Sequence, residues 1–437
     1  MYRKPVNFFL AMIKLIFLIF LIFLLYSCGL IIESSKLIRT ANWAKKGEVV
    51  NVVQHDTVPF EIIGNWVVIS LTVAGEKHKY CVDTGAPTIL DLSDVVNDGI
   101  VTKPSLEKTT YNFLAGRQVY YASANRIDTV AFGKNQYFDV GALTLDFKYF
   151  SNTMFCEDIS GVLGANIMKH GIWSFNYKDS TIILGSDISD FDLGNSFVFD
   201  FCKDSELDNP VFNLNVGDKI LKTLIDTGNP NHSFLKNNKV LNGQDRMSVK
   251  QTHILSRSLI EQEYVNTELE AESSSLMRLT TSDFDNDYLF TVSNSILTTN
   301  KALGDIDLIM GYDFLKDFVT TIDWINNKVY FQPIQKPDLA IKPSSKNMNI
   351  FLSTYDKKTY VSSYLNTYFE KGSINIGDTV KEINHIPIEE ILNEENYCEI
   401  IRGERQLSAK QDTTIITVKN KLGEIRHLKM YDVQLFD

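Results

Sequence analysis

The sequence has 437 residues, of which 44% are hydrophobic and 22% are charged, and its formal net charge is −11. A chain of this length can bury more than one core, so we expect two or three domains. The acidic balance argues against a nucleic-acid partner, which needs a broad basic surface, and is typical of a charge that maintains solubility.

Residues 1–27 have the pattern of a secretory signal peptide, in which basic residues precede the apolar run Leu15 to Leu25. A membrane-spanning helix needs about 20 residues, so this run is short for one. The run ends at Ser27-Cys28, which resembles the lipobox of bacterial lipoproteins. The resemblance implies that Cys28 is lipidated and anchors the protein in the bacterial cell envelope. The alternative is an uncleaved anchor helix over Phe8 to Tyr26, and both place the remaining chain outside the cytoplasm.

From about residue 60, short runs rich in Val, Ile, Thr, Tyr and Phe alternate with Gly, Asn and Asp, which indicates a mostly-β fold. The run Val67 to Val73 turns at Ala74-Gly75 and returns into Asp83-Thr84-Gly85. We therefore expect a β-hairpin with this tripeptide at the end of its second strand. Val162-Leu163-Gly164 follows, with Gly164 81 residues after Asp83.

The same elements occur a second time. Val211 to Val216 turns at Gly217-Asp218 and returns into Asp226-Thr227-Gly228, and Ile309-Met310-Gly311 follows 85 residues after Asp226. The stretches from Gly164 to Leu184 and from Gly311 to Phe331 match over 20 residues without a gap. Two elements in the same order at near-equal spacing predict one fold used twice.

A single Asp-Thr-Gly is a weak signal, because it also forms an ordinary Asx-type turn. Here Val82 to Ala86, together with Val162-Leu163-Gly164, resembles one retropepsin lobe, and the duplication in one chain is similar to pepsin. The likeness covers about residues 60 to 331 and implies two β lobes that face each other across a cleft. It also implies that Asp83 and Asp226 are the catalytic pair of an aspartic endopeptidase.

The resemblance assigns supporting roles to the neighbours of the two aspartates. Thr84 and Thr227 are expected to hydrogen-bond to the opposite loop, while Gly85 and Gly228 let the backbone approach the carboxylates and donate N–H bonds. The second copy departs from the family pattern, because Asn229 stands where Ser, Thr or Ala is usual.

Two carboxyls held close together suit peptide hydrolysis. Like charges repel across a poorly solvated gap, so the pair retains one proton. The ionised member can then activate a water molecule while the protonated member polarises the scissile carbonyl. No metal or cofactor is expected, since no metal-ligand cluster, phosphate-binding loop or Gly-x-Ser-x-Gly motif is present.

A flap is expected to close over the substrate, and Thr110 to Ala122 is the candidate, with an ordinary surface hairpin as the alternative. The polar stretch Glu261 to Ser275 is either a facing loop or a mobile one. Besides Cys28, the chain has Cys81, Cys156, Cys202 and Cys398, and no disulfide can be assigned among them from sequence. Cys81 is expected to be a small core residue.

After a linker rich in Pro, Ser and Lys, the segment Ile376 to Asn384 resembles the Gly-Asp…Ile-Asn segment of bacterial PDZ domains, with closing strands at Thr414 to Lys419 and Arg426 to Met430. No Gly-Leu-Gly-Phe-like loop for a peptide carboxylate precedes it. Two roles stay open: peptide binding by strand addition, and docking against the protease lobes.

The sequence thus predicts a duplicated pepsin/retropepsin-like β fold followed by a small α+β PDZ-like domain. The expected segments are a signal peptide (1–27), a tether (28–55), an N-terminal protease lobe (56–192), a C-terminal protease lobe (193–333), a linker (334–346) and the PDZ-like domain (347–437). The preferred hypothesis is a membrane-tethered aspartic endopeptidase that acts on an extended polypeptide as a monomer. The other two are a catalytically inactive peptide-binding protein with the same fold and an envelope scaffold based on the PDZ-like part.

Overall fold

The computed structural model describes residues between 42 and 434. The residues outside the described set are 1–41, 44, 50–52, 98–107, 112–119, 148–155, 204–207, 217–218, 231–232, 237–250, 255–271, 282–285, 294–305, 335–345, 356–357, 366–369, 371–372, 376, 394–395, 402–412 and 435–437. The predicted signal peptide, Cys28 and the alternative anchor helix all lie outside it. Within the described ranges, no helix is both long and apolar enough to span a bilayer.

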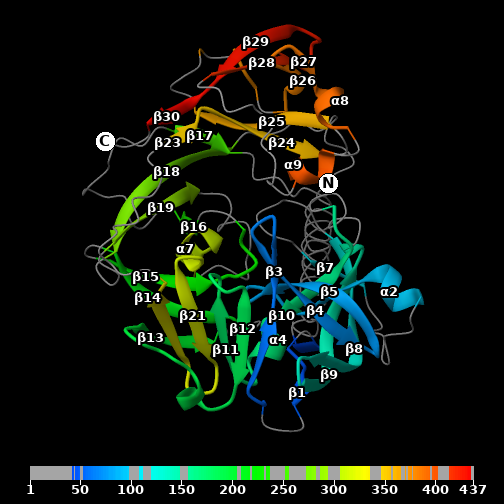
Figure 1. Cartoon of the computed structure of the whole chain (residues 1–437), viewed down its shortest axis with the longest axis vertical. Helices are drawn as coiled ribbons and strands as arrows, with labels where there is room; N and C mark the ends of the chain where they lie inside the picture. The colour runs from blue at the N-terminus through cyan, green and yellow to red at the C-terminus, as the bar shows by residue number, and fades with distance from the viewer. Residues whose placement is uncertain are drawn as a thin grey trace, which may run out of the picture.

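The fold is mostly β and contains a six-stranded barrel. The barrel closes in the order β4-β5-β10-β6-β9-β8 and back to β4. Its strands are β4 (Trp66–Val73), β5 (Glu76–Asp83), β6 (Ile89–Asp91), β8 (Tyr120–Phe132), β9 (Asn135–Leu145) and β10 (Ile159–Gly164). We call this barrel and its connections the first unit. Figure 1 shows it in blue and cyan.

The second unit repeats the strand order of the first. Its strands pair as β14-β15-β20-β16-β19-β18. They are β14 (Pro210–Val216), β15 (Lys219–Ile225), β16 (Ser233–Lys236), β18 (Glu272–Thr281), β19 (Asn286–Ser293) and β20 (Leu308–Met310). The strand directions match as well, because β10 is parallel to β5 and β20 is parallel to β15. The internal repeat seen in the sequence therefore extends to strand pairing.

An antiparallel sheet joins the two units, in the order β2-β12-β11-β21-β22-β13. Its strands are β2 (Asp56–Pro59), β11 (Ile172–Asn176), β12 (Thr181–Gly185), β13 (Phe197–Lys203), β21 (Phe318–Asp323) and β22 (Lys328–Pro333). At its centre the hydroxyls of Ser174 and Thr321 are 2.7 Å apart. These residues are 147 positions apart in the chain, as are Gly164 and Gly311, so the sheet centre lies on the symmetry axis of the repeat.

One hydrophobic core runs through both units. It contains Trp173 and Phe175 from β11 together with Trp324, which follows β21, and Phe331 from β22, all fully buried. The ring of Phe132 stacks on Trp173 at 5.5 Å between centroids. Burial of aromatic side chains from both repeats stabilises them together, so the two units are expected to unfold as one.

The first unit begins earlier than predicted. β1 (Glu48–Val49) pairs with β9, the guanidinium of Arg126 lies 4.7 Å from the ring centroid of Trp43, and Val53 is in the core. The described later part of the segment expected to be a tether (28–55) therefore packs on the fold, with Val53 buried and Trp43 and Val49 partly buried. The remaining elements of this unit are β3 (Glu61–Ile63), α2 (Leu92–Asn97), β7 (Lys108–Tyr111), α4 (Ala165–Met168) and the 3₁₀ turn η1 (Ile188–Asp190).

The C-terminal part has a separate core built from Ile350, Val361, Val380, Ile416 and Val418, among others. Both predicted closing strands are present, as β28 and β29. The elements are β23 (Lys346–Met348), β24 (Ile350–Tyr355), β25 (Lys358–Leu365), β26 (Thr379–Ile383), β27 (Ile386–Pro387), α8 (Ile388–Ile391), α9 (Tyr397–Ile401), β28 (Thr414–Lys419), β29 (Ile425–Met430) and β30 (Asp432–Gln434).

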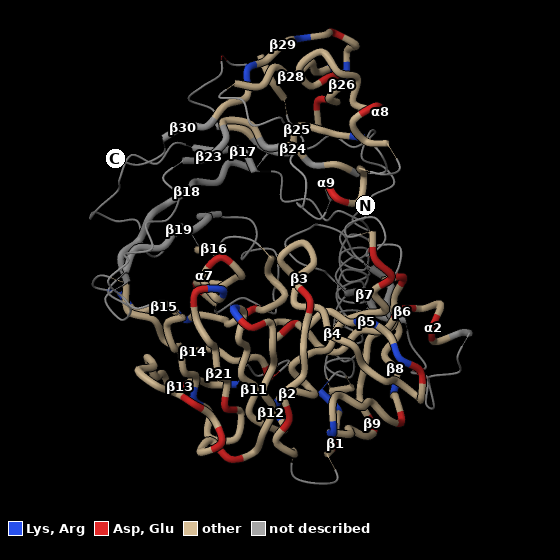
Figure 2. Tube along the Cα trace, viewed as in Figure 1, with Lys and Arg blue, Asp and Glu red and all other residues tan. Residues whose placement is uncertain are grey.

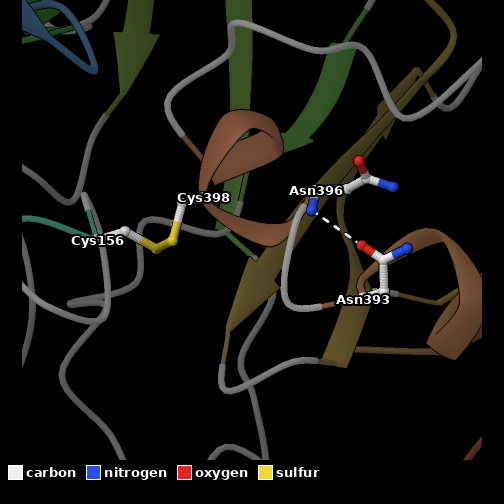
Figure 3. Close-up of a disulfide and its surroundings, with 4 residues drawn as sticks. All are labelled: Cys156, Asn393, Asn396 and Cys398. Carbon is white, nitrogen blue, oxygen red and sulfur yellow. Dashed lines mark hydrogen bonds between the residues drawn. A yellow bond between two sulfur atoms is a disulfide. The ribbon is translucent and has the colours of Figure 1, made fainter.

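Two connections join the C-terminal part to the units below it in Figure 1. A disulfide links Cys156, just before β10, to Cys398 on α9, with their Cα atoms 5.5 Å apart (Figure 3). The start of α9 is held by Asn396, whose N–H donates to Asn393 Oδ1 at 2.9 Å. In addition, β17 (Gln251–Ile254) of the second unit pairs antiparallel with β25.

Of the other cysteines, Cys81 is buried in the core, as predicted, and Cys202 is exposed. Figure 2 shows that acidic and basic positions are interspersed over the described residues, without an extended basic run.

Candidate active site

The two Asp-Thr-Gly loops are delivered by equivalent strands. β5 ends at Asp83, which pairs with Gly164 of the parallel strand β10. β15 ends at Ile225, whose partner Met310 on β20 immediately precedes Gly311. Behind the loops, the N–H of Gly164 donates to Thr88 Oγ1 at 3.2 Å, and the N–H of Gly311 donates to Ser233 Oγ at 3.1 Å. Each loop is therefore supported by the apolar-apolar-Gly strand of its own unit.

Each glycine donates its N–H to the aspartate of its own loop and lies close to the carboxyl group of the opposite aspartate. The N–H of Gly85 donates to Asp83 Oδ1 at 2.7 Å, and the N–H of Gly228 donates to Asp226 Oδ1 at 2.9 Å. A Cβ on Gly85 would lie 2.8 Å from Cγ and Oδ1 of Asp226, and a Cβ on Gly228 would overlap the carboxyl group of Asp83. Glycine is thus needed because the opposite aspartate occupies the space of a side chain.

The threonines cross between the loops. Thr84 Oγ1 donates to the carbonyl of Ile225 at 2.6 Å and accepts from the N–H of Thr227 at 3.1 Å. Reciprocally, Thr227 Oγ1 donates to the carbonyl of Val82 at 3.0 Å and accepts from the N–H of Thr84 at 3.1 Å. The expected crossing bonds are present, and four buried hydrogen bonds fix the separation of the two aspartates.

Both carboxyl groups are nearly inaccessible, with 6% of Asp83 and 4% of Asp226 exposed. Burial raises the pKa of both, because desolvation disfavours the charged form. The pKa of Asp226 is raised further by the negative charge of Asp83. Over the weakly acidic range the pair therefore holds one proton, with one carboxyl available as a base and the other as an acid.

The residues after the two glycines act through their backbones. The N–H of Ala86 donates to the main-chain carbonyl of Asp83 at 3.5 Å, and that of Asn229 donates to the main-chain carbonyl of Asp226 at 3.2 Å. Each N–H also lowers the pKa of the carboxyl of its aspartate. The unusual Asn229 thus leaves this backbone bond intact. Burial raises the pKa of Tyr177, and the charges of Tyr312 and Asp226 add to the effect.

Sequence reasoning missed the polar residues behind the loops. Asn166 Oδ1 accepts from both the N–H and the hydroxyl of Thr88, at 2.9 and 2.8 Å. Its amide donates to the carbonyls of Lys46 and Gly141, each at 2.9 Å. The available signal was Thr88, five residues after Asp83, and Ser233, seven after Asp226, as hydroxyl residues in matching positions.

The predicted flap is described only in part. β7 pairs with the first residues of β8, from Tyr111 opposite Tyr120 to Lys108 opposite Ser123, while the tip at 112–119 lies outside the described residues. Most of Glu261 to Ser275 lies outside them as well. In the portion of the chain that is described, no group of three or more His, Cys, Asp or Glu side chains is placed to hold a metal ion.

Comparison with protein-family models gave no match, and neither did a search of curated proteins. The function must therefore be argued from the geometry of the site.

Proposed function

We propose that this chain is an aspartic endopeptidase with a bilobal pepsin/retropepsin-like fold, the first and second units being its lobes. The observation that carries the proposal is that Asp83 and Asp226 lie together in a buried site. Each carboxyl group lies against the glycine of the opposite loop, and hydrogen bonds of the two threonines connect the loops. An Asx turn needs none of these inter-unit contacts. Their presence at both copies favours a shared catalytic centre.

The chemistry follows from the single proton of the pair. The ionised carboxyl takes a proton from a water molecule as its oxygen attacks the scissile carbonyl, and the protonated carboxyl donates to the carbonyl oxygen. The resulting tetrahedral intermediate collapses when its C–N bond breaks: the carboxyl that took the proton from water gives it to the departing amine, and the former carbonyl oxygen returns its proton to the other carboxyl. The N–H groups of Gly85 and Gly228 keep the carboxyl oxygens oriented toward this step. The substrate class is an extended polypeptide.

We further propose that the C-terminal part is a PDZ-like module that docks on the protease lobes. The Cys156–Cys398 disulfide and the β17–β25 pairing both favour docking over free peptide capture, since they tie this part to each unit. The disulfide also favours an oxidising compartment, in keeping with export and with lipid attachment at Cys28 to the cell envelope.

The decisive experiment incubates the full-length oxidised protein, in detergent, with a mixed peptide library from pH 3 to pH 8. Cleavage products are identified by mass spectrometry, with Asp83→Asn and Asp226→Asn as parallel samples. We expect cleavage by the wild type and none by either variant, while the double variant is no worse than the singles, because the residues act as a unit.

Two other outcomes are informative. Peptides that bind but remain intact would favour the inactive peptide-binding protein, and binding only by the C-terminal part would favour the envelope scaffold. Substantial cleavage by a verified Asp226→Asn protein would contradict the proposal and point to a different active site.

A further inference from the structure

A buried amide reaches the first catalytic loop from the second unit. Asn209 lies just before β14 and is 2% exposed. Its Nδ2 donates to the carbonyl of Gly85 at 3.1 Å. This bond crosses between the units, as the threonine bonds do, but it ends on the peptide that follows the glycine.

That peptide has two polar ends. The carbonyl of Gly85 accepts from Asn209, and the N–H at the other end of the same peptide, on Ala86, donates to the main-chain carbonyl of Asp83 at 3.5 Å. A peptide group is planar, so fixing its carbonyl also fixes the direction of its N–H. The amide of Asn209 therefore braces the turn from Asp83 to Ala86, and this turn carries the N–H of Gly85 that donates to Asp83 Oδ1 at 2.7 Å.

The corner that carries Asn209 is itself anchored. Asp208 has a positive φ of 63°, its carboxylate pairs with Lys169 at 2.9 Å, and its carbonyl accepts from Trp324 Nε1 at 3.3 Å. Lys169 directly follows α4 of the first unit, and Trp324 is fully buried in the second. The amide is thus placed by contacts from both units and has little freedom to move.

The first unit contains a matched residue. Asn65 precedes β4 as Asn209 precedes β14, each two residues before an equivalent valine, and its Nδ2 donates to the carbonyl of Pro230 at 3.1 Å. Asn65 is exposed, however, and Pro230 lies beyond the turn from Asp226 to Asn229, which the N–H of Asn229 closes on the main-chain carbonyl of Asp226. The repeat therefore supplies a control asparagine that crosses between the units without holding a donor to the pair.

We propose that Asn209 is a positioning residue of the catalytic pair, which holds the Gly85–Ala86 peptide and so keeps the N–H of Gly85 on the Asp83 carboxyl. This inference rests on the proposed function and deepens it. The ionisable groups around Asp83 are Asp226 across the pair and the buried thiol of Cys81 on β5, while the phenol of Tyr177 lies on the Asp226 side. None of these is altered by changing Asn209.

The test compares Asn209→Ala, Asn209→Asp and the control Asn65→Ala in the full-length oxidised protein. The first readout is kcat/KM against pH on a peptide that the wild type cleaves. Without the amide the turn loosens and the N–H of Gly85 donates less well to the ionised carboxyl, which raises the pKa of Asp83, so the acid limb should move to higher pH by about one unit in both Asn209 variants. Asp at this position keeps the shape of Asn but, when ionised, has no N–H for Gly85. In Asn65→Ala the acid limb of the profile should stay at the same pH as in the wild type.

A second readout does not depend on catalysis. The same proteins, labelled with ¹³C in the aspartate carboxyl groups, are titrated by NMR, and the Asp83 signal is assigned by its absence in Asp83→Asn. We expect the same upward shift for the Asn209 variants. If the wild type cleaves nothing, the proposed function fails while this titration still decides the role of Asn209. Equal titration of Asn209→Ala and Asn65→Ala would overturn the inference, and so would loss of folding in both Asn209 variants, because the residue would then be structural.

Discussion

Replacing Asp83 by Asn should make the protein more stable at neutral pH. Burial raises the pKa of Asp83 from its ordinary value of 3.8 to about 6. The folded state therefore binds more protons than the unfolded state between these values, and the stability of the wild type falls as the pH rises through this window. Asn is neutral at every pH, is nearly isosteric, and retains an oxygen that can accept from the N–H of Gly85.

The magnitude follows from the shift. A difference of about two pKa units, at about 1.4 kcal/mol per unit, corresponds to about 3 kcal/mol. We expect the free energy of unfolding of Asp83→Asn to exceed that of the wild type by about this amount at pH 7, and by nothing below about pH 4. Urea unfolding followed by tryptophan fluorescence measures it, because Trp173 and Trp324 are fully buried in the shared core.

The control is Asp128→Asn, which removes an exposed carboxylate on β8. It should follow the wild type across the whole range from pH 3.5 to pH 7.5. A variant at Asp83 that is less stable at pH 7, or whose advantage does not change with pH, would refute the reasoning, because the destabilisation would then not arise from a buried charge.

Three further predictions concern other parts of the molecule. Gly228→Ala should abolish cleavage, because the new Cβ would overlap the carboxyl of Asp83, whereas Gly75→Ala, which strains a turn residue with φ of 97° but places no atom within 4 Å of the added Cβ, should lower stability and retain cleavage in the same peptide assay. Cys398→Ser should lower the free energy of unfolding relative to the oxidised wild type by at most about 5 kcal/mol, the chain-entropy limit for a loop of this length, and should match the reduced wild type, as measured in urea. Cys28→Ala should yield an unlipidated precursor by mass spectrometry, and an intact N-terminus at Met1 in the wild type would contradict the lipoprotein hypothesis.

The residues of the site could be predicted from the sequence because each motif is local. A hydrophobic hairpin ending in Asp-Thr-Gly is visible in about twenty residues, and its repetition after a similar interval indicates one fold used twice. The closing strands Thr414 to Lys419 and Arg426 to Met430 were found in the same way, from apolar alternation.

Contacts between distant segments could not be predicted from the sequence. The pairing of β1 with β9, the reach of Asn209 to Gly85 and the bond between Cys156 and Cys398 each join residues far apart in the chain. Nothing in the local pattern around these residues distinguishes them from surface positions, since their roles depend on tertiary packing. An asparagine before a strand is usually read as a turn residue, and four scattered cysteines allow several pairings.

The disulfide imposes an order on assembly. Cys156 and Cys398 are 242 residues apart, so the first unit is synthesised long before its disulfide partner on α9. The bond can close only when α9 has formed beside the segment before β10, so the thiol of Cys156 has to stay available until the C-terminal part is made. If another thiol reacts with Cys156 first, the C-terminal part loses this link to the first unit, and the pairing of β17 with β25 then has to hold it in place.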